Sequence, residues 1–463
     1  MSRSSALKYL EESHERFQDE LIELLRIPSI SHDPAHKVDM DKAAQWLADK
    51  LSAIGLNNVE ILPTAGHSVV YGEWLATRGG ASAPTVLIYG HYDVQSPEPL
   101  EDWKSQPFEP EVRNDNLYAR GASDMKGQTL AAVNAVEALI KTENLPINVK
   151  FLIEGEEEIG SKHLNEFLVS NREKLTADFS LNTDAGGMPD ADTPSICYGL
   201  RGGASFILNI FGPSQDLHSG EYGGVIQNPI HVLSKLIADL HDEHGHVTLT
   251  GFYDKVRRIN DDEHAELARL PFDDAFLLKH SGAPALWGEP EFIPAERIGA
   301  RPTMEVVMFT AGQPKSAIPA KASAGFAFRL VPDQNPHEVH QQFRQHLELH
   351  APPTVKWELE FRGGGPGIIT NRNAPEVVAL KGALGKVFGK DPIFQRAGGG
   401  IGAVLMFKNT LGIDSVLTGF SLYDDNFHGP NEKLHLPTWK KGMVALIHFF
   451  RNLGDGPSEY AGE

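Results

Sequence analysis

Cysteine is almost absent from this chain of 463 residues, because Cys197 is the only one. A single cysteine excludes an intramolecular disulfide, and it has no second thiolate with which to build a zinc site. Any metal that the chain binds must therefore be held by imidazole and carboxylate groups. The sequence contains 20 histidines and 62 acidic residues, so such ligands are available.

Positive charge is also scarce. Lysine and arginine total 42 against 62 for aspartate and glutamate, which gives a formal net charge of -20, and no basic stripe appears. We therefore expect no nucleic-acid partner. No stretch approaches the roughly 18 consecutive apolar residues of a membrane span, and the N-terminus lacks the apolar core of a signal peptide. These absences predict a cytoplasmic protein with no membrane partner.

The length of the chain exceeds what one hydrophobic core usually supports, so two domains are expected. Strands alternate with helices in residues 1–200 and again in residues 371–463, which favours an α/β domain with a mostly parallel sheet and helices on both faces. Residues 201–370 instead follow the order strand, helix, strand, strand, helix, strand, which predicts an inserted α+β domain. Residues 244–300 of this insertion are expected to be rich in loops.

One stretch of the first domain suggests where ligands bind. Val86-Leu-Ile-Tyr-Gly-His-Tyr-Asp-Val-Gln95 predicts a buried strand that ends in a turn carrying His91 and Asp93. Ligands sit at the carboxyl ends of strands in open α/β sheets. The carboxylate can orient the imidazole, or either side chain can bind a metal. A lone His-x-Asp is also typical of an ordinary polar turn.

More acidic residues follow at similar places. Asp124 precedes a helix expected from about 128 to 141, the run Glu154-Gly-Glu-Glu-Glu158 follows an apolar strand, and Asp184 follows another. Each has an ordinary explanation alone, as a carboxylate at a helix N-terminus or as a solvated charged face. Buried together without a cation, these groups would be costly. We expect the carboxyl edge of one sheet to gather all of them at a metal site.

The number of candidate ligands suits two divalent metal ions. A site for two metals needs one bridging carboxylate and about two terminal ligands for each ion. The candidates with this count are His91, Asp124, Glu158, Asp184 and His428. Imidazole and carboxylate ligands favour Zn²⁺, with Mn²⁺ or Co²⁺ as substitutes. Glu157 is then free to take a proton from a metal-bound water, and Asp93 would hold the His91 tautomer.

The order His-x-Asp, Asp, Glu-Glu, Asp, His resembles the M20 family of dizinc peptidases. Four local motifs are most similar to its branch of carnosinases and cytosolic nonspecific dipeptidases: Gly-His-Tyr-Asp-Val-Gln, Arg-Gly-Ala-Ser-Asp-Met-Lys-Gly, Glu-Gly-Glu-Glu-Glu-Ile-Gly-Ser and Asp-Leu-His-Ser-Gly-Glu-Tyr-Gly-Gly. The resemblance covers essentially the whole chain. It implies cleavage of the amide bond of dipeptides or similar small peptides with a free carboxylate.

The resemblance also implies how the ligands are shared. His91 and Asp184 would bind one metal, Glu158 and His428 the other, and Asp124 would bridge them. The main domain would be catalytic, with residues 1–200 and 371–463 as its two parts. The insertion 201–370 would act as a lid and dimerisation domain.

Further roles follow from the same resemblance. Glu157 would be the general base and acid. His218 would reach the active site of the partner subunit in a homodimer and stabilise the oxyanion, and Arg329 would grip the carboxylate of the substrate. The peptide bond between Asp124 and Met125 would be cis.

One segment departs from the family pattern. Relatives usually read Arg-x-Gly-Gly-Ser-Ile-Pro where this chain reads Arg396-Ala-Gly-Gly-Gly-Ile-Gly402. A hydroxyl that contacts the substrate is therefore missing at Gly400. The backbone amides of Gly398 to Gly402 would have to contribute more of the hydrogen bonds.

Other functions stay open at this stage. Within the hydrolases, these are an N-acyl amino acid deacylase and a glutamate-type carboxypeptidase. A NAD-binding protein is a different class, suggested by Gly398-x-Gly400-x-x-Ala403, which follows a predicted strand and opens a predicted helix. A metal-binding protein without catalytic turnover is the remaining alternative.

Overall fold

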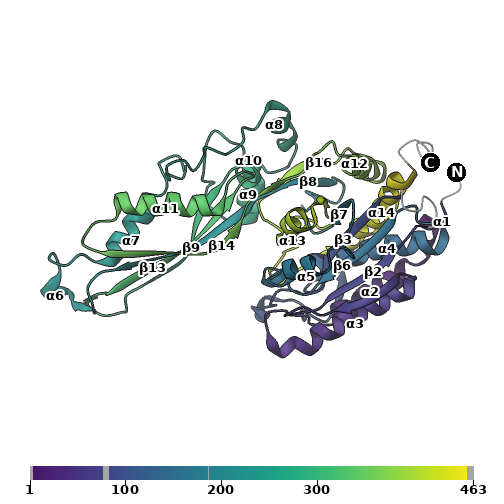
Figure 1. Cartoon of the computed structure of the whole chain (residues 1–463), viewed down its shortest axis with the longest axis horizontal. Coiled ribbons are helices and arrows are strands. Elements are labelled where there is room, and N and C mark those ends of the chain that lie inside the picture. The colour runs from purple at the N-terminus through teal and green to yellow at the C-terminus, as the bar shows by residue number, and fades with distance from the viewer. Residues whose placement is uncertain (1–3, 77–82, 186, 456–463) are drawn as a thin grey trace. The chain divides into compact units, whose positions relative to one another are not determined.

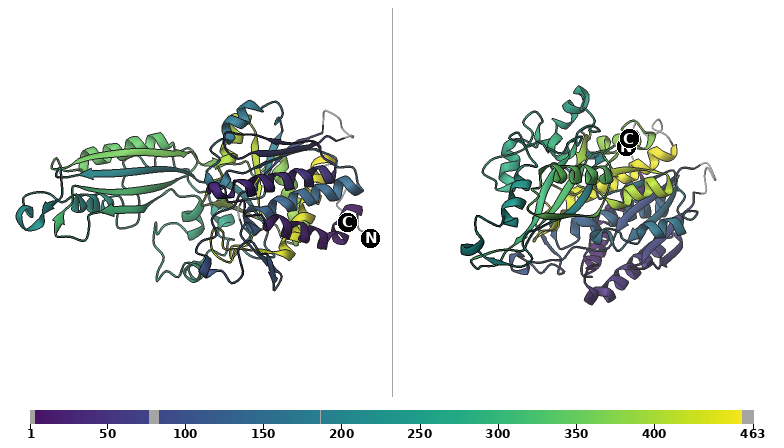
Figure 2. Two further views of the ribbon diagram at one scale, coloured as in Figure 1. Left: turned by 90° about the horizontal axis from the view of Figure 1, so that it is seen from below. Right: turned by 60° about the vertical axis from the view of Figure 1, so that its left-hand side comes forward.

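A computed structural model describes residues 4–76, 83–185 and 187–455. The chain forms two compact units. The first consists of Met1–Tyr198, Thr370–Gln395 and Ile401–Glu463, and the second of Gly199–Ile369 and Arg396–Gly400. Both ends of the chain, purple and yellow, therefore share the first unit, whereas the teal and green middle forms the second (Figure 1 and Figure 2). No helix among the described residues is long and apolar enough to cross a membrane.

The first unit is organised around a large sheet of nine strands. Their order is β1-β2-β6-β3-β7-β17-β8-β15, with β16 paired to β8. The four central strands β6, β3, β7 and β17 are parallel, and the flanking pairs are antiparallel. The strands are β1 (Asn57–Leu62), β2 (Val69–Trp74), β3 (Thr85–His91), β6 (Asn148–Glu154), β7 (Phe179–Asn182), β8 (Ser195–Leu200), β15 (Ile368–Ile369), β16 (Ile393–Ala397) and β17 (Asp414–Thr418). The predicted α/β fold is confirmed.

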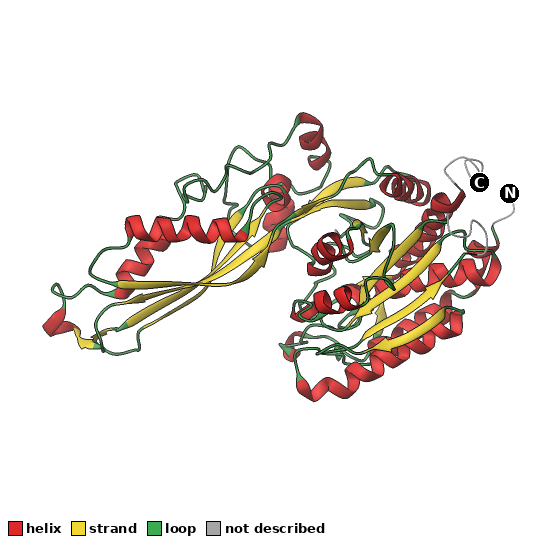
Figure 3. Cartoon of the chain, viewed as in Figure 1, coloured by secondary structure: helices red, strands yellow, loops and turns green. Residues whose placement is uncertain are grey.

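Helices cover both faces of this sheet (Figure 3). Val86 and Ile88 of β3 pack into one core with six helices, whereas Leu87 and Tyr89 pack into another with two. A strand with apolar residues on both sides must be covered on both faces, which explains the continuous apolar run. The first face is covered by α1 (Ser5–Glu12), α2 (His14–Leu25), α3 (Lys37–Ile54), α4 (Gly127–Thr142), α12 (Pro375–Phe388) and α14 (Leu436–Asp455), and the second by α5 (Leu164–Ser170) and α13 (Gly402–Met406).

The strand that precedes Asp124 does not belong to this large sheet. Here β5 (Asn116–Tyr118) pairs with β4 (Glu111–Arg113) and β18 (Lys433–His435) in a separate sheet of three strands. The expectation that one sheet edge supplies every acidic residue is therefore wrong for Asp124. This residue instead lies in a turn between Gly121 and the start of α4.

The second unit contains an antiparallel sheet of four strands in the order β11-β13-β9-β14. Phe206 and Phe326 of this sheet pack with Leu233 of α7 and Phe343 of α11 in one buried core. The helices α7 (Pro229–Ala238) and α11 (Pro336–His350) lie against the sheet (Figure 1). The strands are β9 (Gly202–Phe211), β11 (Thr303–Ala311), β13 (Lys321–Leu330) and β14 (Lys356–Gly365).

Shorter elements complete the second unit. The strands β10 (Leu217–His218) and β12 (Ala317–Ile318) form a two-stranded antiparallel sheet, and α6 (Ser219–Tyr222) comes directly after β10. The region expected to be loop-rich contains three short helices, α8 (Asp261–Leu267), α9 (Asp274–Ser281) and α10 (Pro294–Gly299). Arg396–Gly400 is grouped with this unit, although the sequence-based division placed it in the second part of the main domain.

Candidate metal centre

Five predicted ligands of the first unit lie together as two groups that share one residue. One group is His91, Asp124 and Asp184, and the other is Asp124, Glu158 and His428. In each group the candidate ligand atoms lie within 4.8 Å of one another. A shared carboxylate between two ligand sets is the geometry that two neighbouring metal ions require.

Each oxygen of the Asp124 carboxylate faces a different histidine. His91 Nε2 lies 3.2 Å from Asp124 Oδ1 and 3.7 Å from Asp184 Oδ2. His428 Nε2 lies 3.0 Å from Asp124 Oδ2 and 3.2 Å from Glu158 Oε2. The carboxylate of Asp124 thus connects the two groups, one through each oxygen.

The turn after β3 fixes the orientation of His91. Its Nδ1 lies 3.0 Å from the backbone carbonyl oxygen of Asp93, which can only accept, so Nδ1 donates and Nε2 is left for a ligand. The Asp93 carboxylate is farther from Nδ1, at 3.4 Å. It accepts the backbone N–H groups of Glu157 and Glu158 at 3.2 and 3.0 Å. Asp93 therefore joins the turn of His91 to the acidic run, and its carbonyl group is the nearer partner of the imidazole.

A buried glutamate that the sequence analysis missed holds the turn of Asp124. The carboxylate of Glu432 accepts the N–H groups of Gly121, Ser123 and Asp124 at 2.8 to 3.0 Å. It also accepts a bond from Arg120 Nη1 at 2.8 Å. The only sequence signal was an acidic residue four positions after His428. The peptide bond between Asp124 and Met125 is cis, as the family resemblance implied.

His428 lies on a loop whose ends are tied together. Lys433 Nζ contacts the carboxylates of Asp424 and Asp425, both at 2.9 Å. Asp425 also accepts a hydrogen bond from the hydroxyl of Ser123 at 2.6 Å, and Ser123 directly precedes Asp124 in the chain. His428 itself has a φ of 57° and a half-exposed side chain. The loop of His428 and the turn of Asp124 are thus held against each other by several hydrogen bonds.

The charges of the site indicate that a cation belongs there. Hydrogen bonds to Asp124 and Glu158 raise the pKa of His428 to about 10. Although burial favours its neutral form, His91 has a raised pKa because it contacts Asp124, Asp184 and Asp93. Burial and the charge of Asp124 raise the pKa of Asp184 to about 6. Among the described residues these carboxylates contact no lysine or arginine, and they favour the protonated form of both histidines.

The donor set fits divalent metal ions. His91 Nε2 is a buried atom without a well-oriented hydrogen bond among the described residues, and it points at two carboxylates. Carboxylate oxygens and imidazole nitrogens suit Zn²⁺, Mn²⁺ or Co²⁺. A metal would supply the positive charge that protons on His91 and His428 supply otherwise.

Glu157 belongs to neither ligand group. Its pKa is raised to about 8 by burial and, against the effect of His91, by the charges of Asp184, Asp124 and Glu158. This side chain therefore lies within the electrostatic field of the site without being one of its close ligands. A carboxyl group whose pKa is near neutral can both accept and release a proton.

Three predicted site residues belong to the second unit. His218 on β10 and Arg329 on β13 have exposed side chains. A Cβ atom built on Gly400 would lie 2.4 Å from the carbonyl oxygen of Arg201. The hydroxyl that the family resemblance implies at this position is missing, and this backbone leaves no room for a side chain at Gly400.

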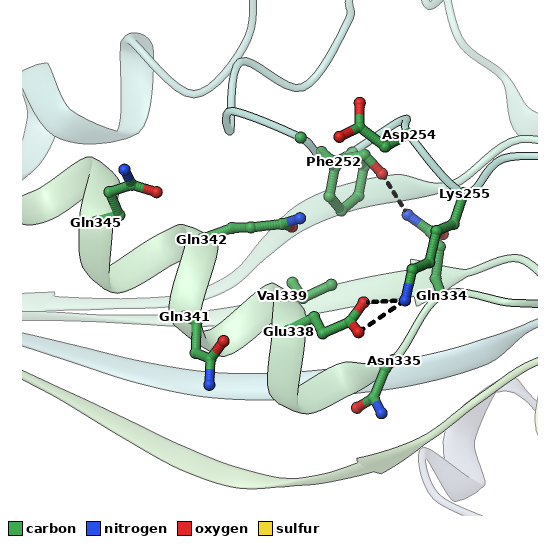
Figure 4. A pocket seen from close by; sticks show the side chains of 11 residues that line it. Phe252, Asp254, Lys255, Gln334, Asn335, Glu338, Val339, Gln341, Gln342 and Gln345 are labelled. Atoms are coloured by element: carbon green, nitrogen blue, oxygen red, sulfur yellow. Dashed lines mark hydrogen bonds and ion pairs between the residues drawn. The ribbon is translucent and has the colours of Figure 1, made fainter.

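The second unit also has a cavity of about 410 Å³, which is not lined by these three residues. Its lining comes from α11 and the segment around Phe252, and amide side chains such as Gln334, Gln342 and Gln345 dominate it (Figure 4). Lys255 at its rim is already paired with Glu338 at 2.7 and 2.8 Å. The cavity contains none of the predicted site residues.

Comparisons with known proteins identify relatives over nearly the whole chain. A Cys-Gly metallodipeptidase of Candida albicans is 29% identical over 466 residues, which cover 95% of this chain and 96% of that protein. A human Beta-Ala-His dipeptidase is 29% identical over 464 residues, which cover 94% of this chain and 90% of that protein. The crystal structure of an M20 family metallo-carboxypeptidase from Sulfolobus solfataricus is 32% identical, with a TM-score of 0.84, and the match covers 95% of this chain and 99% of that one.

The sequence profile of one family agrees with these relatives and with the motifs. The family described as Peptidase family M20/M25/M40 matches residues 87–452, which is far more than half of the chain. All five predicted metal ligands lie within the matched residues. The chain belongs to peptidase family M20/M25/M40 and is a metal-dependent peptidase.

Proposed function

We propose that this enzyme cleaves the amide bond of dipeptides, or of similar small peptides with a free carboxylate, with the help of two divalent metal ions. The observation that carries the proposal is that Asp124 belongs to both ligand groups. Two relatives over nearly the full length are named dipeptidases, which supports the substrate class. Zn²⁺ is the proposed metal, with Mn²⁺ or Co²⁺ as working substitutes.

Each ion would have two terminal ligands and one shared ligand. His91 and Asp184 would hold one ion, Glu158 and His428 the other, and Asp124 both. When bound, such ions lower the pKa of a water molecule and polarise the carbonyl group of the peptide. The charge of the ions would also lower the pKa values of the carboxyl groups around them.

Glu157 would then act as a carboxylate. In this proposal it accepts the proton of the attacking water and delivers it to the nitrogen of the departing amine. Asp93 would support both steps, because its carboxylate holds the backbone of Glu157 and its carbonyl group holds His91. His218 would stabilise the negative oxygen of the transition state, and Arg329 would bind the carboxylate of the substrate.

The proposed assembly is a homodimer in which His218 completes the site of the partner. The edge strand β11 supports this proposal, since no described strand pairs with its outer side. It exposes Val306, Val307, Met308 and Phe309, with Val307 67% exposed. Pairing with β11 of a second copy would cover this apolar edge. Val307→Lys should shift the protein towards the monomer in analytical ultracentrifugation, whereas Leu349→Lys, at a similarly exposed position of α11, should not.

One other substrate class has a specific observation in its favour. The relative from Sulfolobus solfataricus is named a metallo-carboxypeptidase. A carboxypeptidase that removes acidic residues would use the same metal centre.

The cytoplasmic location expected from the sequence stays a prediction, which cell fractionation tests.

The test of the proposed function is metal-dependent turnover. The protein is stripped of metal with a chelator and assayed against dipeptides and N-acyl amino acids with Zn²⁺, Mn²⁺ or Co²⁺ added. Dipeptide hydrolysis should return with about two equivalents of metal per chain, as counted by mass spectrometry. The matched control is Glu157→Gln, which should bind the metal and stay inactive. Hydrolysis that persists in the chelated protein would refute the proposal.

A further inference from the structure

Arg201 is a mostly buried guanidinium group without a carboxylate partner. It lies directly before β9, and its donors reach only neutral oxygen atoms. Nε donates to the carbonyl oxygen of Gly398 at 2.8 Å. Nη1 donates to the carbonyl oxygen of Arg301 at 3.1 Å and to Thr303 Oγ1 at 3.4 Å. No ion pair within 4 Å joins Arg201 to any described residue, and its Nη2 has no hydrogen bond there.

Arg329 is a second arginine at the same corner of the sheet. In the strand register its Cα lies opposite Gly203 of β9 and opposite Thr303 of β11. Thr303 is also the residue whose hydroxyl accepts a bond from Arg201. The side chain of Arg329 is exposed and makes no hydrogen bond or ion pair with the described residues. Burial and the nearby charge of Arg329 lower the pKa of Arg201 to about 10, against a smaller effect of Glu305.

Several other arginines of this unit pair with carboxylates. Arg257 pairs with Asp333 at 2.6 Å, and Arg301 and Arg396 pair with Glu289 and Glu263. The whole chain also carries 20 more formal negative than positive charges, so carboxylates are not in short supply. Like charges side by side repel, and a bound anion removes this cost. Guanidinium groups suit carboxylates because they bind both oxygens in one plane.

The glycine segment that departs from the family pattern is attached to the same arginine. Besides the bond from Nε to Gly398, the backbone N–H of Arg201 donates to the carbonyl oxygen of Gly399 at 3.1 Å. Gly400 lies so close to the Arg201 carbonyl that it leaves no room for a serine side chain. Where relatives offer a hydroxyl, this chain offers a segment fixed next to a free positive charge.

We propose that Arg201 and Arg329 form a two-arginine anion site, and that the enzyme therefore prefers peptides whose C-terminal residue is aspartate or glutamate. This inference rests on the proposed function, because it assumes that a peptide carboxylate binds at Arg329. Arg329 holds the main-chain carboxylate, and Nη2 of Arg201 donates to the carboxylate of the side chain. A dianionic end group neutralises both cations, which a single carboxylate does not.

The first test compares peptides that differ only in this second charge. The metal-loaded enzyme is assayed with Ala-Glu against Ala-Gln and with Ala-Asp against Ala-Asn. The kcat/KM for the acidic member of each pair should be about tenfold higher or more, mainly through a lower KM. Equal kcat/KM values within both pairs would overturn the proposal.

The second test assigns the preference to Arg201. Arg201→Met should abolish the preference for Ala-Glu while changing kcat/KM for Ala-Gln less than about threefold. Arg201→Lys, which keeps the charge, should restore part of the preference. Thr303→Val removes a neutral hydrogen-bond acceptor of Arg201 and should keep the preference for Ala-Glu. Arg257→Met removes a paired arginine of the same unit and serves as the matched control, with no change expected. An equal loss for both peptides in Arg201→Met would mean that Arg201 only supports the glycine segment.

A binding measurement separates this inference from the proposed function. Calorimetry with glutarate, a dianion, and with butyrate, a monoanion of similar length, needs no turnover. Wild-type protein should bind glutarate about tenfold more tightly, and Arg201→Met should not distinguish the two. If no dipeptide is hydrolysed but this difference is found, the function is wrong and the anion site stands. If dipeptides are hydrolysed without any such difference, the anion site is wrong.

Discussion

The two units of this enzyme leave opposite charges without partners. In the first unit, Asp124, Glu158 and Asp184 crowd around two histidines, and no described lysine or arginine contacts them. In the second, Arg201 and Arg329 lie at one corner of a sheet, and no carboxylate of the described residues contacts them. Proteins normally pair charges that they bury, because an isolated buried charge is costly. An unpaired set therefore indicates a ligand, which is a cation in the first unit and an anion in the second.

The largest effect is expected from removing the shared charge of the first unit. Asp124→Asn keeps the shape of the side chain but loses the charge that both metal ions would share. Activity should fall by about a thousandfold or more, and both equivalents of metal should bind more weakly. Mass spectrometry of the dialysed protein counts the metal. Asp192→Asn, at an exposed ion pair with Lys441, is the control, and an Asp124→Asn protein with two tightly bound metals would contradict the prediction.

Two adjacent carboxylates should separate proton transfer from metal binding. Glu157→Gln should lower kcat by about a hundredfold to a thousandfold with the metal content unchanged, because Glu157 lies outside both ligand groups. Glu158→Gln should instead lower the metal content. Both are measured by steady-state kinetics and metal analysis of the same samples. If the two variants exchange these properties, the roles within the acidic run are shifted by one position.

Mixing two inactive variants tests whether the second unit completes the site of a partner. His218→Ala and Glu157→Ala homodimers should each be nearly inactive. In a mixed dimer one of the two sites has both groups, so activity should return in proportion to the heterodimer formed. Native mass spectrometry measures that fraction. Verified heterodimers without activity would show that His218 acts within its own chain or has no catalytic role.

A smaller effect is expected for stability at the glycine segment of the second unit. Gly400→Ser places a Cβ atom 2.4 Å from the carbonyl oxygen of Arg201, so the backbone must shift. The free energy of unfolding should fall by about 1 to 3 kcal/mol, as measured in urea. Gly399→Ser is a matched control, because nothing lies within 4 Å of a Cβ atom at Gly399. Equal stability of the two variants would mean that the segment moves freely away from Arg201.

The smallest effect concerns His448, a buried histidine of the first unit that belongs to neither ligand group. Burial and the charges of Lys386 and Arg451 lower the pKa of His448 to about 4. The unfolded chain takes up this proton near pH 6.5, but the folded chain does so only near pH 4. The free energy of unfolding should therefore fall as the pH drops from about 6.5 to about 4. Above that range His448 should cause no dependence of stability on pH. The difference between the urea midpoints at pH 7 and pH 5 should be smaller in His448→Gln than in the wild-type protein. An equal difference in both proteins would show that His448 is not a source of the pH dependence.

Local sequence patterns predicted the parts of the fold that depend on neighbouring residues. The apolar run from Val86 to Tyr89 faces both sides of the sheet, and the chain alternates strands and helices as expected. The three short helices between 244 and 300 were missed, because they lack a long apolar repeat. The insertion was predicted from its order of strands and helices, which also depends on short stretches of sequence, and Gly199–Ile369 belong to the second compact unit.

Contacts between distant segments were harder to predict. Glu432 holds the turn of Asp124 across more than 300 residues, and nothing around Glu432 indicates that contact. The expectation that one sheet edge supplies every acidic residue was wrong for Asp124 for the same reason, since β18, the partner of β5, is distant in the sequence. Arg201 has the appearance of any charged residue before a strand. Its importance depends on Arg329 and Gly400, which only the tertiary structure brings near it.

The position of β17 has a consequence for how the enzyme is made. This strand, Asp414–Thr418, lies between β7 and β8 in the sheet, although both are synthesised more than 200 residues earlier. At a synthesis rate of about 5 to 20 residues per second, the ribosome needs on the order of 10 to 40 seconds to reach it. During that time β7 has no neighbour on one side, and four of the five ligands wait for His428. In the proposed two-metal site, the ion held by Asp124, Glu158 and His428 would therefore have to wait until the loop of His428 has been made, whereas all ligands of the other ion are made earlier.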